Sequence, residues 1–192
     1  MGRVSQAQAE ENRRRVVDTA SRLLRERGTQ VSVADLMKAS GLTHGAFYKQ
    51  FDSKGALVDE ATAHAFAELT RRHAAGIERY DGRRDAAQRA LIDTYLSVEH
   101  RDDAADGCPV AGLASDIARE GGGAEARRVY TEGVAGFAAF LGADEAGGDG
   151  DEDGIARLCT LFGALVLARA TKGSPLSEQI LAAAHAALTE TG

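Results

Sequence analysis

Residues 31–57 hold two short amphipathic segments separated by a glycine, and this pattern constrains the fold of the chain more than any other feature. Ser32 precedes apolar residues spaced as on one face of a helix, and Asp35 follows it at the position of a capping partner. A helix should therefore begin near Val33. It should end at Gly41, because glycine adopts the left-handed conformation of a helix end at little cost.

The second segment is predicted to form a helix from His44 to about Gln50, with Thr43 at its N-cap. Phe47 and Phe51 lie one helical turn apart, which places both rings on the face toward the core. Two short helices joined by a tight connection that contains glycine form a helix-turn-helix pattern. The sequence therefore predicts a DNA-binding element, although an ordinary helical hairpin would show the same apolar spacing.

The outward face of the second segment carries side chains that suit DNA. His44 and Tyr48 share this face, and both donate and accept hydrogen bonds. Gly45 lacks a side chain, so the backbone can approach a phosphate closely. Ser53 is predicted to cap a third helix, in whose first turn Lys54 is unfavourable unless an anion such as a DNA phosphate lies nearby. The alternative is a solvated face with an exposed tyrosine and histidine.

The whole stretch resembles the DNA-binding domain of the TetR (tetracycline repressor) family. The similarity runs without a gap from about Arg14 to Leu57 and includes the segment GLTHGAFYKQFDSKGAL. The family usually has histidine where this chain has Gln50, and glutamine can still bond a phosphate. The resemblance implies a DNA-contacting set made up of Thr43, His44, Gly45, Tyr48, Lys49, Gln50 and Lys54.

The composition favours helices throughout the chain. It includes only two prolines and 5% aromatic residues, while 44% of the residues are hydrophobic and no strand-like alternation is present. We therefore expect an all-α fold of about nine helices. A helix-turn-helix domain of three helices should occupy residues 1–55, and a ligand-binding and dimerisation domain residues 56–192. The predicted helices span residues 6–27, 33–40, 44–50, 54–79, 84–100, 107–119, 124–141, 154–171 and 176–190.

Charge is divided unevenly between the two expected domains. Residues 1–55 contain 10 Lys and Arg against 6 Asp and Glu, whereas residues 56–192 contain 13 against 23. Phosphate attraction is screened beyond about 8–10 Å at physiological salt, so the acidic remainder does not exclude DNA binding. The chain shows no apolar leader and no apolar run of about 18–20 residues, so we expect a cytoplasmic protein without a membrane partner.

Cys108 allows two interpretations. A helix N-terminus favours a thiolate, but the aspartates of residues 102–106 disfavour one, so we prefer a small packing residue to a redox sensor. Residues 149–154 are similar to the opening of an EF-hand loop, yet Thr160 stands where calcium requires a glutamate. No metal site and no cofactor are therefore expected.

The histidines are scattered and match no catalytic motif, so no enzymatic activity is expected. We expect His44 to contact DNA and the other four histidines to lie at the protein surface. These four are His64, His73, His100 and His185.

The second domain should contain a mostly apolar ligand pocket. Its candidate lining residues, for each of which core packing is the alternative, are Phe66, Leu69, Leu91, Tyr95, Cys108, Val110, Phe137 and Phe140. Residues 154–190 are apolar over broad faces and rich in alanine. The resemblance implies that the last two helices form a four-helix interface in a homodimer.

These features lead to one expected function and one alternative. We expect a TetR-like transcriptional repressor that binds a palindromic operator as a dimer and is released by a small-molecule effector. The effector would shift the long helix that begins near Lys54 and so change the spacing of the two DNA-binding elements. The alternative is a helical protein-binding scaffold that does not bind DNA.

Overall fold

The computed structural model describes residues 6–119, 123–142 and 150–190, and every regular element within these ranges is a helix. The predicted all-α class is thereby confirmed. The elements are α1 (Gln6–Arg27), α2 (Val33–Ala39), the 3₁₀ helix η1 (His44–Lys49), α3 (Lys54–Arg79), α4 (Arg84–Tyr95), α5 (Val98–Asp102), α6 (Pro109–Ala118), α7 (Ala124–Leu141), α8 (Gly150–Ala170) and α9 (Pro175–Thr189).

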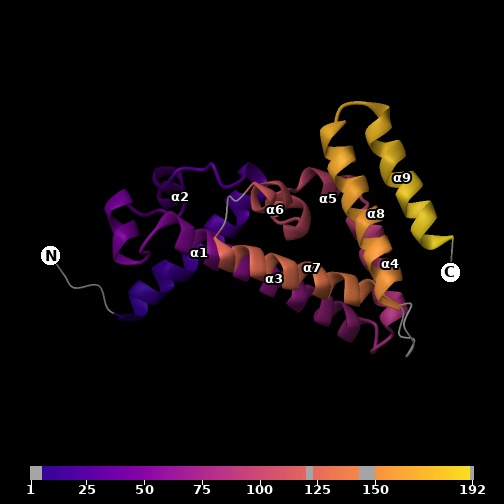
Figure 1. The fold of residues 1–192 in the computed structure, drawn as a ribbon, viewed down its shortest axis with the longest axis horizontal. Coiled ribbons are helices and arrows are strands. Elements are labelled where there is room, and N and C mark those ends of the chain that lie inside the picture. Colours follow the sequence, from indigo (N-terminus) through magenta and orange to yellow (C-terminus); the bar gives the residue numbers. More distant parts are fainter. Residues whose placement is uncertain (1–5, 120–122, 143–149, 191–192) are drawn as a thin grey trace.

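Figure 1 shows an elongated molecule whose two ends are built differently. The helices α1, α2 and η1 gather at one end, and the hairpin of α8 and α9 stands at the other. Between them runs α3, with α7 packed along it. A displacement of α3 would therefore reach both ends of the molecule.

Two hydrophobic cores correspond to these two ends. The first surrounds Leu24, Met37 and Phe47 and also takes in Leu113 and Ile117 of α6. The second is built from α3, α4 and α7–α9 around Phe137, Leu141, Leu161 and Leu165. Because α6 contributes to the first core, the end that holds α1, α2 and η1 packs directly on the rest of the chain.

Close packing of α3 against α7 depends on a glycine. A Cβ atom at Gly133 would lie 2.0 Å from the Phe66 ring, far inside van der Waals contact. Phe66 in turn meets Tyr130 edge to face, with ring centroids 5.6 Å apart. The absence of a side chain at position 133 therefore sets how near the two long helices approach.

The predicted single helix over residues 84–100 is wrong. The chain breaks after Tyr95, and Ser97 starts α5 by accepting a hydrogen bond from the His100 amide at 3.1 Å. The Ser97 hydroxyl also donates to the Thr94 carbonyl at 2.8 Å, so it closes the end of α4. Val98, the first residue of α5, is exposed.

The prediction that α8 begins at Gly154 is also wrong, because the helix already begins at Gly150. Asp151 and Asp153 of the EF-hand-like stretch are therefore helical rather than part of a loop, and Asp149 lies outside the described residues. Within the described ranges, none of the helices combines the length and apolar character needed to span a membrane.

Candidate nucleic-acid interface and effector cavity

The turn between α2 and η1 is fixed by local chemistry. Gly41 adopts a φ of 70°, which only glycine reaches without strain, and the Leu42 amide donates back to the Met37 carbonyl at 2.8 Å. Phe47 is 1% exposed and stacks on Phe51 with ring centroids 5.5 Å apart. This aromatic pair anchors η1 to the first core and fixes which face of η1 points outward.

The second helix of the motif is 3₁₀ and not α-helical. Its bonds run from the Ala46 amide to the Thr43 carbonyl and from the Gln50 amide to the Phe47 carbonyl, at 2.9 and 2.8 Å. Thr43 occupies the predicted N-cap position, but its side chain accepts no cap hydrogen bond. A short segment without a side-chain cap and with Gly45 in its first turn favours the tighter form.

Five of the seven predicted DNA-contacting residues are exposed on one end of the molecule. Tyr48 is 67% exposed, and its ring meets that of His44 edge to face at a centroid distance of 5.7 Å. Lys49 is the exposed cation beside them. The exposed members are Thr43, His44, Gly45, Tyr48 and Lys49, whereas Gln50 and Lys54 are partly buried.

Lys54 has a partner inside the protein. Its ammonium donates to the Thr29 carbonyl at 2.5 Å, and Ser53 caps the same helix by accepting from the Ala56 amide at 3.0 Å. The carbonyl offsets the unfavourable position of a cation in the first turn of α3, a role that the sequence had suggested for a DNA phosphate. Lys54 thus ties α3 to the end of α1.

Arg13 holds the far side of η1. Its guanidinium donates to the Gln50 carbonyl and to the Glu60 carboxylate, and it lies over the Phe51 ring at 4.4 Å from the centroid. Arg14 pairs with Glu11. Arg13 therefore links α1, η1 and α3, although its side chain is still 40% exposed.

A cavity of about 340 Å³ lies beside α3, in the half of the molecule away from η1. Its walls come from α3, α4, α5, α7 and the start of α6. Six of the eight predicted pocket residues line it, namely Leu69, Leu91, Tyr95, Cys108, Phe137 and Phe140. The remaining two, Phe66 and Val110, are buried in the adjoining core, where the Val110 carbonyl accepts from the Tyr130 hydroxyl at 2.9 Å.

The predicted surface position of His73, a cavity residue, is wrong. It was expected at the surface, but it is 9% exposed and stacks on Phe140 with ring centroids 4.3 Å apart. Its Nε2 atom has no hydrogen-bond partner, and burial lowers its pKa from 6.5 to about 4. A signal was present, because His73 continues the helical spacing of Phe66 and Leu69 on α3.

Burial also disfavours the charged forms of three other cavity groups, His100, Cys108 and Tyr95. His100 was likewise expected at the surface but is partly buried, and burial lowers its pKa. Its Nδ1 donates to the Tyr95 carbonyl at 2.7 Å, which leaves Nε2 as an acceptor. Burial raises the pKa of the Cys108 thiol and raises that of Tyr95 well above its ordinary value. The thiol is disfavoured as a thiolate mainly by burial, and not by the neighbouring aspartates that the sequence had indicated.

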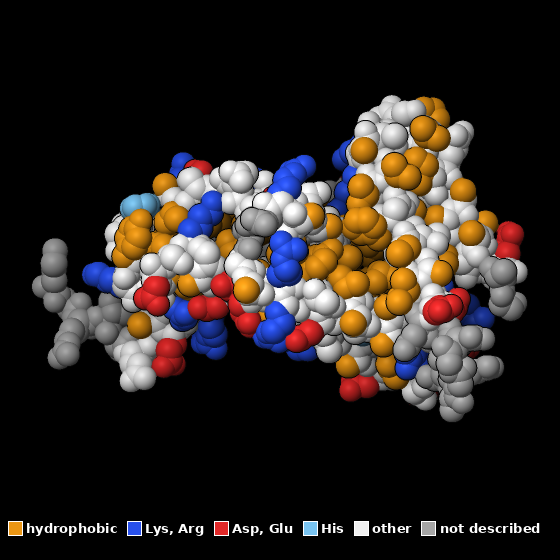
Figure 2. Space-filling model, viewed as in Figure 1, with side chains coloured by type: hydrophobic (Ala, Val, Ile, Leu, Met, Phe, Trp, Pro, Cys, Tyr) orange, Lys and Arg blue, Asp and Glu red, His pale blue; other side chains and the backbone are white. Residues whose placement is uncertain are grey.

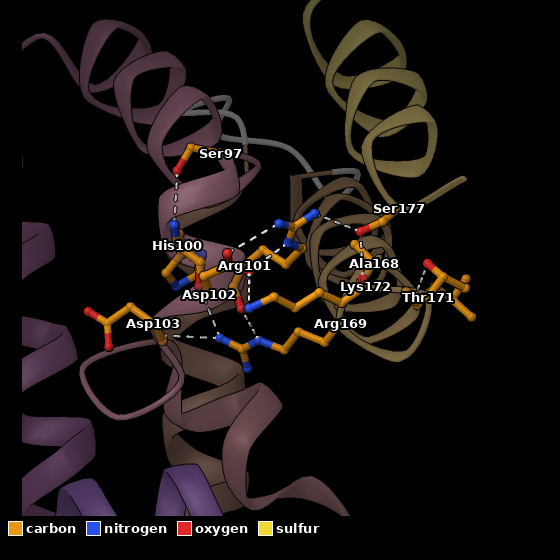
Figure 3. Close-up of polar contacts among 11 residues, drawn as sticks. Ser97, His100, Arg101, Asp102, Asp103, Ala168, Arg169, Thr171, Lys172 and Ser177 are labelled. Carbon is orange, nitrogen blue, oxygen red and sulfur yellow. Dashed lines mark hydrogen bonds and ion pairs between the residues drawn. The ribbon is translucent and has the colours of Figure 1, made fainter. Parts of the chain in front are cut away.

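Polar contacts join the cavity wall at α5 to the hairpin of α8 and α9 (Figure 3). Arg101 is 8% exposed, and its Nη1 donates to the Ser177 hydroxyl of α9 at 2.9 Å. That hydroxyl donates to the Ala168 carbonyl of α8 at 2.7 Å. From α8, Arg169 reaches back and donates to the Arg101 and His100 carbonyls at 3.0 and 3.2 Å. One wall of the cavity is therefore fixed to the hairpin.

The outer end of this network is ionic. Asp102 binds Arg101 at 2.8 Å and Lys172 at 3.0 Å, and hydrogen bonds from Arg101 first and Lys172 second lower the pKa of Asp102 to about 2. Asp102 is thus directed toward the α8–α9 hairpin, away from the Cys108 thiol.

The hairpin of α8 and α9 carries an apolar surface. Ile155 and Leu167 are each more than half exposed, and Val166 and Leu176 are exposed beside them. Figure 2 shows hydrophobic side chains gathered along this hairpin. Large exposed apolar side chains on adjacent helices are typical of a surface that another protein covers.

Comparisons with known proteins agree on this architecture. Residues 16–61 match the family described as "Bacterial regulatory proteins, tetR family". No curated protein sequence matches the chain. Among solved structures, a TetR transcriptional regulator from Chloroflexus aurantiacus superposes with a TM-score of 0.75 at 23% identity, covering 95% of this chain and 94% of that one.

Two further structures share the fold at lower identity. Escherichia coli NemR in its reduced form gives a TM-score of 0.73 at 18% identity, covering 94% of this chain and 96% of that one. A regulator from Saccharomonospora viridis in complex with choline gives 0.67 at 17%, covering 91% and 94%. Residues 16–61 thus match the TetR family model, and nearly the whole chain shares the fold of these solved regulators.

Proposed function

We propose that this regulator is a repressor that binds a near-palindromic operator as a homodimer and leaves it when a small molecule enters the cavity. Residues 1–55 would bind DNA, and residues 56–192 would bind the effector and dimerise. The observation that supports this most is the course of α3, which starts beside η1 at Lys54 and lines the cavity with Leu69 and His73. TetR-family regulators bind DNA operators and small-molecule ligands and act as dimers.

The DNA contacts are assigned by exposure. Tyr48 and His44 present hydrogen-bonding edges for base readout, and Lys49 presents a free cation for a phosphate. Gly45 leaves the backbone of η1 open to a close phosphate. Lys54 and Gln50 support this surface from behind, because both are partly buried and bonded to other parts of the chain.

Dimerisation is assigned to residues 154–190. The exposed apolar side chains of α8 and α9 would pack on the same surface of a second copy, giving a symmetric interface of four helices. Because the hairpin and η1 lie at opposite ends of the molecule, such a dimer would hold two DNA-binding ends apart. To contact one face of the duplex, the two DNA-binding ends must lie about 34–36 Å apart, or a multiple of that distance.

The lining of the cavity indicates the class of effector. None of the described lining residues is an aspartate or a glutamate, while Arg72 and Arg79 lie among them. The stacked rings of His73 and Phe140 suit a flat molecule, and the acceptor nitrogen of His100 suits a hydroxyl group on it. The two arginines suit a carboxylate. We therefore propose a compact aromatic effector that is neutral or anionic, in contrast to the cation choline bound by the S. viridis protein.

Release follows from differential affinity. A molecule that binds more tightly when α3 is displaced shifts the equilibrium toward the displaced position. The size of the shift is set by the ratio of its affinities for the two positions of α3. A displaced α3 would move Lys54 and the end of η1 with it, so the two DNA-binding ends would no longer match the operator spacing. TetR-family regulators are generally non-enzymatic, and we assign no reaction to the cavity.

The proposal is tested by selecting bound sequences from random duplex DNA, footprinting the product and measuring the mass of the free protein by sedimentation. We expect an inverted repeat, protection of both half-sites and a dimer at micromolar concentration. Protection of one asymmetric half-site, or monomer alone, would contradict the dimeric mechanism. Failure to enrich any sequence would favour a protein-binding scaffold instead. A thermal-shift screen of aromatic acids, phenols and quaternary amines then tests the effector class.

A further inference from the structure

We propose that Asp18, His64 and Glu68 form a binding site for a divalent first-row transition-metal ion where α1 crosses α3. The His64 Nε2 atom lies 3.5 Å from Asp18 Oδ1 and 3.9 Å from Glu68 Oε2. The three potential ligand atoms all lie within 4.8 Å of one another. His64 and Glu68 are one helical turn apart and share a face of α3, while Asp18 reaches across from α1.

The distances fit a metal better than a direct hydrogen bond. A hydrogen bond from an imidazole to a carboxylate requires about 2.7–3.2 Å, and His64 Nε2 is buried without such a partner. Metal bonds of about 2.0–2.2 Å at tetrahedral angles place neighbouring ligand atoms about 3.3–3.6 Å apart. The His64–Asp18 distance already matches this spacing, and small rotations of the Asp18 and Glu68 side chains would bring all three atoms to it.

A contrasting pair in the same protein shows what a simple ion pair looks like. His185 Nε2 lies 2.6 Å from Asp93 Oδ1, in direct contact and with a single carboxylate. His64 instead faces two carboxylates and contacts neither at that distance. The convergence of one imidazole and two carboxylates on one point therefore distinguishes the α1–α3 cluster.

The surroundings favour a transition metal over calcium or magnesium. Arg25 is buried, and its Nη2 lies 3.8 Å from Glu68 Oε2, so its positive charge offsets one of the two carboxylates. Hard ions such as Ca²⁺ and Mg²⁺ rely on several oxygen ligands and on negative charge. An imidazole nitrogen with two carboxylate oxygens suits Zn²⁺, Co²⁺ or Ni²⁺, whose remaining positions water can fill from the adjoining surface groove, which Asp18 and His64 line.

An ion at this position would fasten the DNA-binding end to α3. Metal bonds between two separate helices form only in the folded protein, so binding would raise thermal stability. This inference is independent of the effector cavity, because the cluster lies at the α1–α3 crossing and shares none of the residues that line that cavity. No spacing in the sequence marks it, since only the crossing of α1 and α3 brings Asp18 to His64.

The test uses the full chain with any affinity tag removed and stripped of metal by chelation. Co²⁺ is titrated while visible absorption is recorded, and Zn²⁺ is added to thermal melts. We expect one ion per chain, cobalt absorption bands from nitrogen and oxygen ligands, and a Tm increase of about 5–10 °C at a Zn²⁺ concentration one hundred times its Kd.

Substitutions identify the ligands. Asp18→Asn, His64→Gln and Glu68→Gln should each weaken Co²⁺ binding at least about tenfold while circular dichroism and the metal-free Tm show that the protein is folded. His185→Gln is the matched control and should bind as the wild type does. Saturable binding that survives all three substitutions, loss of binding in His185→Gln, or the absence of saturable binding would each overturn the proposal. Full competition by millimolar Mg²⁺ would overturn the assigned class of ion.

Discussion

The recognition segment η1 and the effector cavity are assembled over very different distances along the chain. The outward side chains of η1 come from residues 43–49, a single short segment, although its buried face packs on the first core. The cavity collects residues from 69 to 140, which meet only because α3, α4, α5 and α7 pack together. A local motif thus defines the first site, and tertiary packing defines the second.

This difference predicts how each site responds to substitution. In η1, packing and surface contact fall on different side chains, because Phe47 is buried whereas its neighbour Tyr48 is exposed. In the cavity, packing and binding fall on the same residues, as with His73, which is stacked in the core and lines the pocket. Stability and function should therefore be separable in η1 and coupled in the cavity.

The largest expected effect concerns the aromatic anchor of η1. Phe47→Ala should destabilise the folded state by about 3–5 kcal/mol, because a fully buried ring is replaced by a void. DNA binding should be lost with the structure of α2 and η1. Chemical denaturation gives the free energy of unfolding, and hydrogen exchange of the α2 amides reports whether this end opens first. As a control, Phe140→Ala enlarges the cavity and should leave DNA binding in place.

His73 should make stability depend on pH. Its pKa is about 4 in the folded protein against an ordinary value of 6.5. Between these values the unfolded chain binds a proton that the folded chain does not, so stability is full above pH 6.5 and falls as the pH falls toward 4. The loss amounts to about 3 kcal/mol. Denaturant titrations across this range should show it.

The isosteric variant His73→Phe serves as the comparison for that measurement. It should flatten the pH dependence while keeping the ring stacked on Phe140. A remaining slope is expected from His100, whose pKa burial also lowers. An unchanged pH profile in the variant would show that His73 is not buried in neutral form.

Tyr48→Ala should affect DNA binding and leave folding unchanged. The side chain is exposed, so the free energy of unfolding should stay within about 0.5 kcal/mol of wild type. Affinity for the operator should fall by roughly 1–3 kcal/mol, with a smaller loss on random DNA if Tyr48 contacts base edges. Equal losses on both DNAs, measured by fluorescence anisotropy, would make it a backbone contact.

The smallest effect separates two lysines of the same surface. Lys49→Ala should reduce the slope of log affinity against log salt by about 1.8 for a bound dimer, because it removes one phosphate contact from each protomer. Lys54→Ala should change that slope less and lower the Tm instead, since its ammonium is bonded to the Thr29 carbonyl. A reversed result would place Lys54 on the DNA.

The sequence predicted the features that depend on neighbours. Ser32 and Ser53 cap α2 and α3 as expected, and Gly28 and Gly41 adopt left-handed conformations after α1 and α2. The outward exposure of His44 and Tyr48 also follows from local spacing. These features could be predicted because the atoms that determine them lie within one or two helical turns.

What sequence reasoning missed depends on distant partners. The break after Tyr95 is stabilised by Arg169 of α8, a helix much later in the chain, which donates hydrogen bonds to carbonyls of α5. His73 is buried by rings from α7, and Lys54 finds its partner at the end of α1. Helical periodicity places His73 on the face of Phe66 and Leu69, but it does not indicate which distant residues meet that face, so these partners could be found only from the folded structure.

The central claim is that occupation of the cavity changes the distance between the two DNA-binding ends of a dimer. It is tested by pulsed electron paramagnetic resonance on Asp52→Cys, labelled in a background where Cys108 and Cys159 are replaced by serine. Asp52 is exposed at the end of η1 and lies outside the proposed DNA contacts. We expect one narrow distance on the selected operator and a shifted distance when the compound found by thermal-shift screening is added. A compound that lowers operator affinity while this distance stays unchanged would contradict the account.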